Sequence, residues 1–206
     1  MAEIVLTTAY LAPIVYYSEM VNADTVYLEN FDFYLKQTYR NRCQIAAANG
    51  SMILTIPVEK ADSGKMLTRD VCISQHNDWQ IQHWRSIESA YNSTPFFEYY
   101  KDELVPFYEK KWMFLWDFNQ EIQAKMFELL NLDILILPTK EYKNIPDKKI
   151  LDLRDAIHPK KENKYVNCDP YYQVFEQRFG FQPNLSIIDL LFNMGNESIF
   201  SLIHDS

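Results

Sequence analysis

The fold is decided near the N-terminus by residues 4–28, which read IVLTTAYLAPIVYYSEMVNADTVYL. The β-branched run Ile4–Thr7 predicts a strand. Pro13 marks the start of a short helix that runs to Met20, because a proline costs least where a helix begins. Thr25–Leu28 predicts a second strand. Strand, helix and strand within about thirty residues is the spacing of a βαβ unit, so we expect the two strands to pair in parallel.

Further strands are predicted on both sides of the middle of the chain. Asn49-Gly50 is a strong hairpin-turn signal, and we expect it to join strands at Gln44–Ala47 and Met52–Pro57. Val71–Ser74 is another candidate strand. Asp133–Leu137 is apolar on both faces and ends at Pro138. That pattern predicts a central strand of the sheet.

The middle of the chain predicts helices. Apolar residues recur at helical spacing before Pro95 and again from Phe97, where Pro106 should end the helix near Val105. Leu115–Leu129 carries the longest regular stripe. Ser186 to Asp189 resembles a capping box for a last helix that ends at Gly195. We therefore expect a single α/β domain over residues 1–206: a mixed β-sheet with an N-terminal βαβ-like unit and a helical middle section packed on it.

Composition excludes several function classes. The 206 residues are 48% apolar and 23% charged, as in an ordinary globular protein, and the net charge is −8. That charge works against nucleic-acid binding, which needs a basic face. With only four glycines, the chain has no Walker loop, dinucleotide-binding turn or glycine-lined oxyanion hole.

The three cysteines and the N-terminal residues give information about the cellular location of the protein. The cysteines are widely separated and form no CxxC pair, so a disulfide framework or zinc ribbon is not expected. The N-terminus carries no signal-peptide pattern, and no apolar run is long enough to span a bilayer. These features predict a cytoplasmic protein without a membrane span.

Residues 140–164 differ from the rest of the chain. They hold eight Lys/Arg and five Asp/Glu, a balance of +3, whereas the remainder carries −11. Three prolines interrupt or border the segment. We therefore expect a surface segment that is more mobile than the rest, because little burial offsets the entropy of ordering it.

Two groups of residues could carry chemistry. His83 lies four residues before Ile87 on a predicted helix, where it could act as a general base or as a hydrogen-bonded structural group. Lys36, Arg40, Asn41 and Arg42 form the densest cationic cluster of this acidic chain. The cluster could bind the phosphate or carboxylate of an anionic small molecule, or could pair with carboxylates such as Glu29 and Asp32. No metal motif is present among the histidines.

Four blocks of the sequence, in order, resemble the WbqC-like family. The first is Tyr10-Leu11-Ala12-Pro13 with Tyr16-Tyr17. The second runs from Lys36 through Asn41-Arg42 and Asn49-Gly50 to Leu54-Thr55-Ile56-Pro57-Val58. The third comprises Trp79, His83, Ile87, Ala90-Tyr91 and Pro95-Phe96-Phe97, and the fourth is Leu185 to Asn193 with Gly195. The resemblance as a whole runs from about residue 4 to residue 199.

The resemblance implies a role in bacterial surface-polysaccharide (O-antigen-type) biosynthesis. It implies a transferase, such as one that moves a glycyl or acyl group onto a sugar. His83 would be catalytic, and Lys36, Arg40, Asn41 and Arg42 would bind an anionic, nucleotide-sugar-type ligand. The alternative is a non-catalytic binding or scaffold protein of the same pathway. Thr7-Thr8-Ala9 stands where many members have His-Gln-Pro, and the resemblance identifies no cofactor and no oligomeric state.

Overall fold

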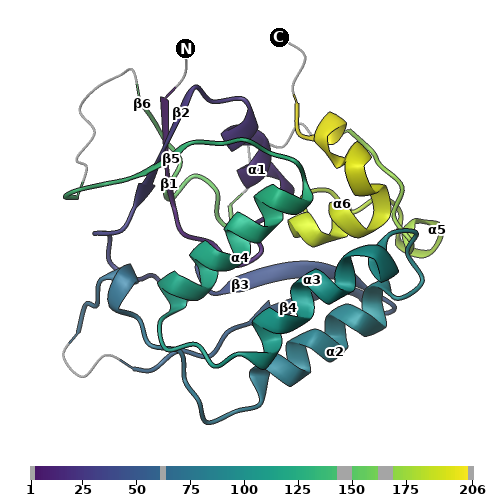
Figure 1. The fold of residues 1–206 in the computed structure, drawn as a ribbon, viewed down its shortest axis with the longest axis horizontal. Helices are drawn as coiled ribbons and strands as arrows, with labels where there is room; N and C mark the ends of the chain where they lie inside the picture. Colours follow the sequence, from purple (N-terminus) through teal and green to yellow (C-terminus); the bar gives the residue numbers. More distant parts are fainter. Residues whose placement is uncertain (1–2, 61–63, 143–149, 162–168, 204–206) are drawn as a thin grey trace.

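A four-stranded parallel sheet forms one half of the protein (Figure 1). The structure, a computed structural model, describes residues 3–60, 64–142, 150–161 and 169–203. The strand order is β5-β2-β1-β6, and every neighbouring pair is parallel. The strands are β1 (Glu3–Thr7), β2 (Thr25–Glu29), β5 (Ile136–Pro138) and β6 (Ile150–Asp152). Helix α1 (Ile14–Val21) joins β1 to β2, which confirms the predicted βαβ unit.

A separate antiparallel hairpin, β3 (Arg42–Ala47) and β4 (Gly50–Thr55), forms a second sheet. It confirms the hairpin predicted at Asn49-Gly50. Ala47 lies opposite Gly50, so Ala48 and Asn49 make the turn. Gly50 takes a φ of 108°, which glycine adopts without steric cost. The predicted α/β class is therefore confirmed, with the parallel and antiparallel pairings in two different sheets.

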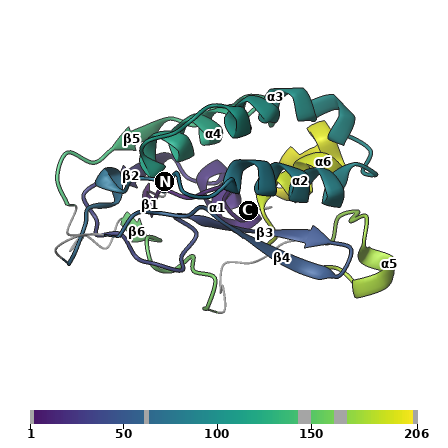
Figure 2. The ribbon, with the colours of Figure 1, turned by 90° about the horizontal axis from the view of Figure 1, so that it is seen from below.

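Three helices from the middle of the chain form a layer against the strands (Figure 2). They are α2 (Trp79–Tyr91), α3 (Phe97–Glu109) and α4 (Leu115–Leu129). Helix α2 packs on both α3 and β3, and α4 packs on α3. None of the helices in the described ranges has the length and apolar character needed to cross a bilayer.

The predicted helix end near Val105 is wrong, because α3 continues through Pro106 to Glu109. Its last turn carries Tyr108, whose buried hydroxyl lies 2.9 Å from the hydroxyl of Tyr10. Proline removes one helical hydrogen bond. Tertiary packing of the following residues can offset that loss, since most helical stability in proteins comes from packing.

The predicted central strand at Asp133–Leu137 is also wrong. The observed strand β5 is short and starts only at Ile136. Within the described residues it lies at the edge of the sheet and pairs with β2 alone. Leu135, just before the strand, is 71% exposed. Pro138 lies within β5, which fits an edge strand because proline cannot donate to a second neighbour. An apolar run predicts a strand but does not determine how many partners it has.

The candidate strand at Val71–Ser74 forms only isolated bridges. Ile73 bridges Val58 and Cys72 bridges Phe114. A short 3₁₀ turn, η1 (Thr68–Asp70), comes directly before this segment and packs on α4. The four residues therefore connect neighbouring loops and do not extend either sheet.

Part of the 140–164 segment belongs to the interior. Residues 150–152 form β6, and the side chains of Leu153, Arg154 and Ile157 are buried. The expectation of a surface segment is wrong for this part, because strand pairing with β1 orders the chain and buries the residues that follow. Residues 143–149 and 162–164 lie outside the described residues, and the predicted mobility of the segment stays a prediction.

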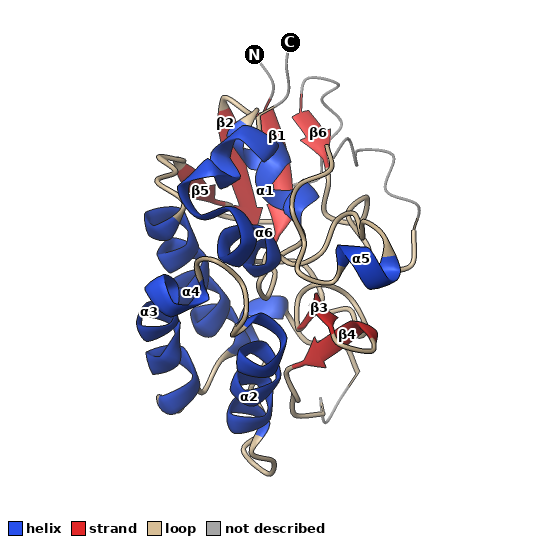
Figure 3. Cartoon of the chain, turned by 90° about the vertical axis from the view of Figure 1, so that its right-hand side faces the viewer, coloured by secondary structure: helices blue, strands red, loops and turns tan. Residues whose placement is uncertain are grey.

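The last long helix, α6 (Ile187–Met194), lies beside α1 (Figure 3). Gly195 follows it with a φ of 56°, as predicted for a C-cap. The predicted capping box does not form. Ser186 Oγ donates instead to the carbonyl of Leu11 at 2.7 Å. The Asp189 carboxylate accepts from the hydroxyls of Tyr91 and Tyr171 at 2.9 and 2.6 Å. Because α6 is buried, the side chains of Ser186 and Asp189 form hydrogen bonds with other segments and not with the helix start.

Two short helices flank α6 in the sequence. They are α5 (Glu176–Phe179) and η2 (Gly195–Ser201).

Candidate functional site at the carboxyl edge of the parallel sheet

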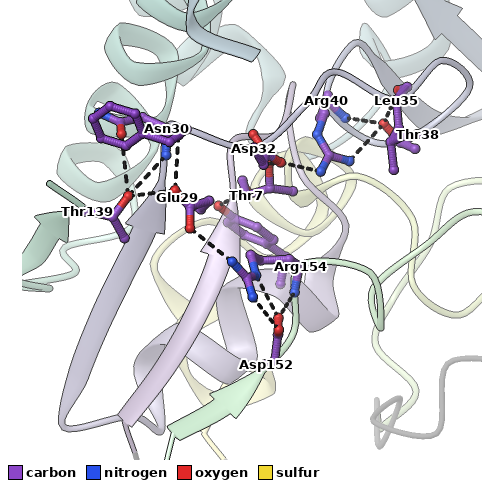
Figure 4. Close-up of polar contacts among 12 residues, drawn as sticks. Thr7, Glu29, Asn30, Asp32, Leu35, Thr38, Arg40, Thr139, Asp152 and Arg154 are labelled. Carbon is purple, nitrogen blue, oxygen red and sulfur yellow. Dashed lines mark hydrogen bonds and ion pairs between the residues drawn. The ribbon is translucent and has the colours of Figure 1, made fainter. Parts of the chain in front are cut away.

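The carboxyl ends of the parallel strands bring several polar residues together (Figure 4). Strand β1 has β2 on one side and β6 on the other, so the order of the chain across the sheet reverses at β1. In open α/β sheets, ligands bind outside the carboxyl ends of strands at such a reversal. Four side chains at or just beyond these ends meet here: Thr7 of β1, Glu29 of β2, Thr139 after β5 and Asp152 of β6.

Glu29 and Arg154 form a buried ion pair at this edge. Glu29 is fully buried, and its carboxylate accepts from Arg154 Nη1 at 2.9 Å and from Thr139 Oγ1 at 2.7 Å. The backbone amide of Phe31 donates to the same carboxylate at 3.0 Å. Arg154 also donates from Nε and Nη2 to Asp152, at 3.0 and 2.6 Å. Burial alone would raise the pKa of Asp152, but the hydrogen bonds and charge of Arg154 hold it below its usual value.

Asp32 and Arg40 form a second buried ion pair. Asp32 is 6% exposed and Arg40 is 3% exposed. Arg40 Nη2 donates to Asp32 Oδ2, and the hydroxyl of Thr7 donates to the same oxygen at 2.9 Å. The pairing with Asp32 left open at the level of sequence therefore forms at Arg40. Glu29, the other candidate partner, pairs with Arg154.

A small cavity is lined by both arginines and by the end of β1. Its walls include Thr7, Tyr16, Thr38, Arg40 and Arg154. It offers about 10 Å³ to the centre of a water molecule, which is room for about one water. The arginine of each ion pair thus lines this small cavity, together with apolar side chains such as Leu6 and Leu153.

The other members of the predicted cationic cluster occupy different surroundings. Asn41 is buried and donates from Nδ2 to the carbonyl of Ile56 at 2.8 Å, so it fastens the start of β3 to the end of β4. Lys36 is exposed and Arg42 is half-buried. Burial raises the pKa of Tyr34 to about 12 although the charges of Arg42 and Arg40 oppose that rise, so both arginines lie near this tyrosine.

His83 lies in the hydrophobic core, away from the two ion pairs. Its Nδ1 is 3.0 Å from the hydroxyl of Tyr10, which in turn lies 2.9 Å from the hydroxyl of Tyr108. The imidazole stacks on the Tyr10 ring and meets Trp79 edge to face. It lines none of the three cavities described in this section. His83 and the predicted cationic cluster therefore share none of these cavities, and a catalytic role for His83 stays a prediction.

The surroundings of His83 make the stability of the protein depend on pH. Burial lowers the pKa of His83 to about 4, and a hydrogen bond to the backbone of Thr55 only partly opposes this. An unfolded histidine has a pKa of about 6.5, so the unfolded state binds more protons between these values. The contribution of His83 is thus fully present above about pH 6.5 and is lost as the pH falls towards 4.

We expect the free-energy advantage of the wild type over His83→Gln to shrink by about 3 kcal/mol between pH 7.5 and pH 4. Urea unfolding of both proteins across this range measures the difference, and His83→Gln serves as the reference that does not titrate at this position. A difference that stays constant with pH would show that His83 remains accessible to protons in the folded state.

Two wider surface hollows lie elsewhere, on either side of the segment Lys111 to Met113. One has a volume of about 640 Å³ and also contacts Met66 and Cys72. The other has about 380 Å³ and also contacts Trp116. Neither is lined by a residue of the predicted site. Within the described ranges, no three histidine, cysteine or carboxylate side chains gather closely enough to hold a metal ion.

Sequence reasoning missed Arg154 and Asp152, which complete the site. They lie in the charged segment that was expected at the surface. The available signal was the apolar pair Ile150-Leu151 directly before Asp152, since a charged residue at the end of a short apolar strand often lies at the carboxyl edge of a sheet.

Comparison with known proteins assigns the chain to a family. The chain is 25% identical over 190 residues to "Uncharacterized protein Rv1507c" of Mycobacterium tuberculosis (strain ATCC 25618 / H37Rv), a match that covers 80% of this chain and 81% of that protein. No solved structure matches. The model of the WbqC-like protein family matches residues 8–169, a range that includes the first three blocks of the resemblance, Arg40 and Arg154 but not the block at Leu185–Gly195. The chain therefore belongs to the WbqC-like protein family.

Proposed function

We propose that the protein is a cytoplasmic group transferase of bacterial surface-polysaccharide biosynthesis that moves an aminoacyl or acyl group, such as glycyl, onto a sugar. The observation that carries this proposal is the pair of buried ion pairs, Glu29–Arg154 and Asp32–Arg40, at the switch point of the parallel sheet. Buried ion pairs stabilise a fold poorly compared with apolar packing. Their place at the carboxyl edge supports binding of a polar ligand.

In this proposal, Arg40 and Arg154 hold the phosphate or carboxylate of the donor. A guanidinium can bind such a group through two parallel hydrogen bonds, and the ligand would take over bonds that Asp32 and Glu29 accept now. Lys36 and Arg42 add positive charge near Arg40, and Asn41 keeps that loop attached to β4. The proposal does not depend on His83.

The transfer needs a base for the acceptor. The hydroxyl or amine of the sugar forms a bond to the acyl carbon, the donor's leaving group departs with its electron pair, and a base takes the acceptor's proton. Asp32 suits this role because the Thr7 hydroxyl still holds its Oδ2 when Arg40 binds the donor, while its Oδ1 has no hydrogen-bond partner among the described residues.

One observation favours the second candidate function, a non-catalytic binding or scaffold protein. Both arginines are already paired with carboxylates, and the cavity between them has room for about one water. A protein that only bound a partner molecule would not need Asp32 to be reachable by an acceptor.

Ligand-induced changes in melting temperature test the proposal. We expect one member of a panel of nucleotide sugars, coenzyme-A esters and amino acids to stabilise the wild type by about 5–10 °C at a hundred times its Kd. The variant Arg40→Lys should lose most of that shift, because lysine cannot form the two parallel bonds. Arg85→Lys is the matched control, since Arg85 is exposed on α2 and does not line the cavity. If no member of the panel stabilises the wild type, the transferase proposal fails.

A further inference from the structure

The smaller of the two surface hollows is built on the first two turns of α4. It has a volume of about 380 Å³, which is within the range of small-molecule sites, and it is open to solvent. The segment directly before α4 forms its other wall. We call this space the Trp116 hollow, and its polar and aromatic lining includes Lys110, Lys111, Trp116, Asp117, Gln120 and Glu121. A small ligand therefore reaches these side chains without any movement of the chain.

Trp116 supplies an aromatic surface to the hollow. Its side chain is half-buried, with one part packed against the core. Among the described residues, no other aromatic ring contacts its indole and no group accepts from its Nε1–H. Trp112 differs, because the Phe107 ring stacks on it with centroids 6.1 Å apart and Lys110 Nζ lies 4.0 Å from its centroid. Trp116 is thus the ring that remains available to a ligand.

Polar side chains with unused hydrogen-bonding capacity line the same hollow. Lys111 and Asp117 are exposed, and neither forms an ion pair or a side-chain hydrogen bond within the described ranges. Gln120 donates from Nε2 to Thr8 Oγ1 at 3.3 Å, so its Oε1 is the atom left to accept from a ligand. The hollow therefore offers donors and acceptors beside one aromatic ring.

The charges and the kinds of atom restrict what that ligand can be. Lys110 and Glu121 pair with each other at 3.5 Å, and Lys111 and Asp117 carry opposite charges, so the lining has no net charge. No excess of charge favours an anion or a cation. A sugar ring is neutral, its hydroxyls both donate and accept, and its C–H face packs on a flat indole. The lining matches each of these properties.

Two hydrogen bonds connect the same part of α4 to the candidate functional site. Gln120 of the hollow contacts Thr8, which directly follows Thr7 of that site. Asn119, the residue before Gln120, donates from Nδ2 to the backbone carbonyl of Arg40 at 2.8 Å. The wall of the hollow therefore adjoins the end of β1 and the loop that carries Arg40.

We propose that the Trp116 hollow binds a neutral sugar ring, which stacks on Trp116 and forms hydrogen bonds with Lys111, Asp117 and Gln120. The class of ligand follows from the lining of the hollow. Its role rests on the proposed function, in which the acceptor is a sugar. In that role the hollow holds a sugar unit of the acceptor next to the candidate site.

Neutral sugars test this inference separately from the donor panel. Wild-type protein labelled with nitrogen-15 is titrated with glucose, galactose, mannose and N-acetylglucosamine, and the indole N–H signals are followed by NMR. The chain has four tryptophans, and the signal that disappears in Trp116→Phe identifies Trp116. We expect one of the sugars to shift this signal saturably, because its ring packs on the indole.

Trp116→Ala removes the stacking surface. We expect this variant to bind the same sugar about tenfold more weakly, as measured by saturation-transfer NMR on the sugar. Tyr99→Ala is the matched control, because it removes an aromatic ring that is 77% exposed on α3 and does not line the hollow. The affinity of the control should equal that of the wild type.

Asp117→Asn tests the polar half of the hollow and covers the case in which Trp116→Ala perturbs the start of α4. Asp117 is exposed, so the variant should fold as the wild type does. We expect it to weaken sugar binding about fivefold, since a hydrogen bond to a carboxylate is about twice as strong as one to a neutral amide. Asp102→Asn, at an exposed position on α3, is its control and should leave binding unchanged.

The outcomes separate this inference from the proposed function. It is overturned if no sugar shifts the Trp116 signal, if Trp116→Ala and Asp117→Asn bind the sugar as the wild type does, or if adenosine, uridine or glycine shifts that signal and no sugar does. A donor that stabilises the wild type while no sugar binds would overturn this inference alone. Sugar binding that both variants weaken supports it even where no donor binds, and in that case only the transferase proposal fails.

Discussion

Arg40→Ala is expected to lower the free energy of unfolding by about 3–5 kcal/mol, whereas Arg42→Ala should lower it by about 1 kcal/mol or less. The two arginines are two residues apart in the sequence, but Arg40 is buried and Arg42 is half-buried. Removal of the Arg40 side chain leaves the buried carboxylate of Asp32 with the Thr7 hydroxyl as its one side-chain donor among the described residues. Arg42 is half-buried and pairs with no carboxylate in the described part of the chain.

Urea unfolding at pH 7 measures both changes, and one double variant checks the reason for them. In Asp32→Asn/Arg40→Met neither charge remains, so we expect the double variant to recover part of the stability that Arg40→Ala loses. Equal and small effects of Arg40→Ala and Arg42→Ala would contradict the buried pair. They would instead indicate that the Asp32 carboxylate and Arg40 are solvated.

Arg154→Ala is expected to cost a similar amount, about 3–5 kcal/mol. Arg154 is the cation that faces fully buried Glu29, and it also holds Asp152 at the end of β6. Without it, the Glu29 carboxylate keeps only the Thr139 hydroxyl and the Phe31 amide among the donors described above. The loss should also loosen β6, since that short strand pairs with β1 alone.

Lys125→Ala is the matched control for this prediction. Lys125 forms ion pairs with Glu103 and Glu128 on exposed helix surfaces, and such pairs contribute less than about 1 kcal/mol. Hydrogen exchange at the amides of residues 150–153 supplies a second readout, which should rise in Arg154→Ala and not in Lys125→Ala. A stability loss for Arg154→Ala no larger than that of the control would mean that the Glu29 site is open to water.

One of the two ion pairs could be predicted from the sequence, and the other could not. Lys36, Arg40, Asn41 and Arg42 stand out as a cationic cluster by composition alone, and Asp32 could be named as a partner because it lies eight residues from Arg40. Arg154 is 125 residues from Glu29, and no local sequence pattern predicts a contact over such a separation. Its own neighbourhood, rich in charge and proline, pointed to the surface.

His83 illustrates the same limit. Helical spacing placed it beside an apolar stripe, which is correct, but left both a general base and a structural group open. Its hydrogen-bond partner Tyr10 comes from a distant loop and stacks on the imidazole. The Tyr10 hydroxyl is bonded in turn to Tyr108 of another helix. A histidine at the border of an apolar stripe faces either a cavity or the core, and only the packing of other elements determines which.

The secondary-structure elements that depend on interactions between residues close in the chain could be predicted from the sequence. The βαβ unit, the hairpin at Asn49-Gly50 and the helices of the middle section follow from residue propensity, turn chemistry and apolar periodicity, all of which act over a few residues. Tertiary structure alone decided that β5 lies at the edge, that α3 continues through Pro106, and that Arg40 and Arg154 are paired with buried carboxylates. Each of these depends on burial and pairing between segments far apart in the chain, and the energy of those contacts outweighs local preference.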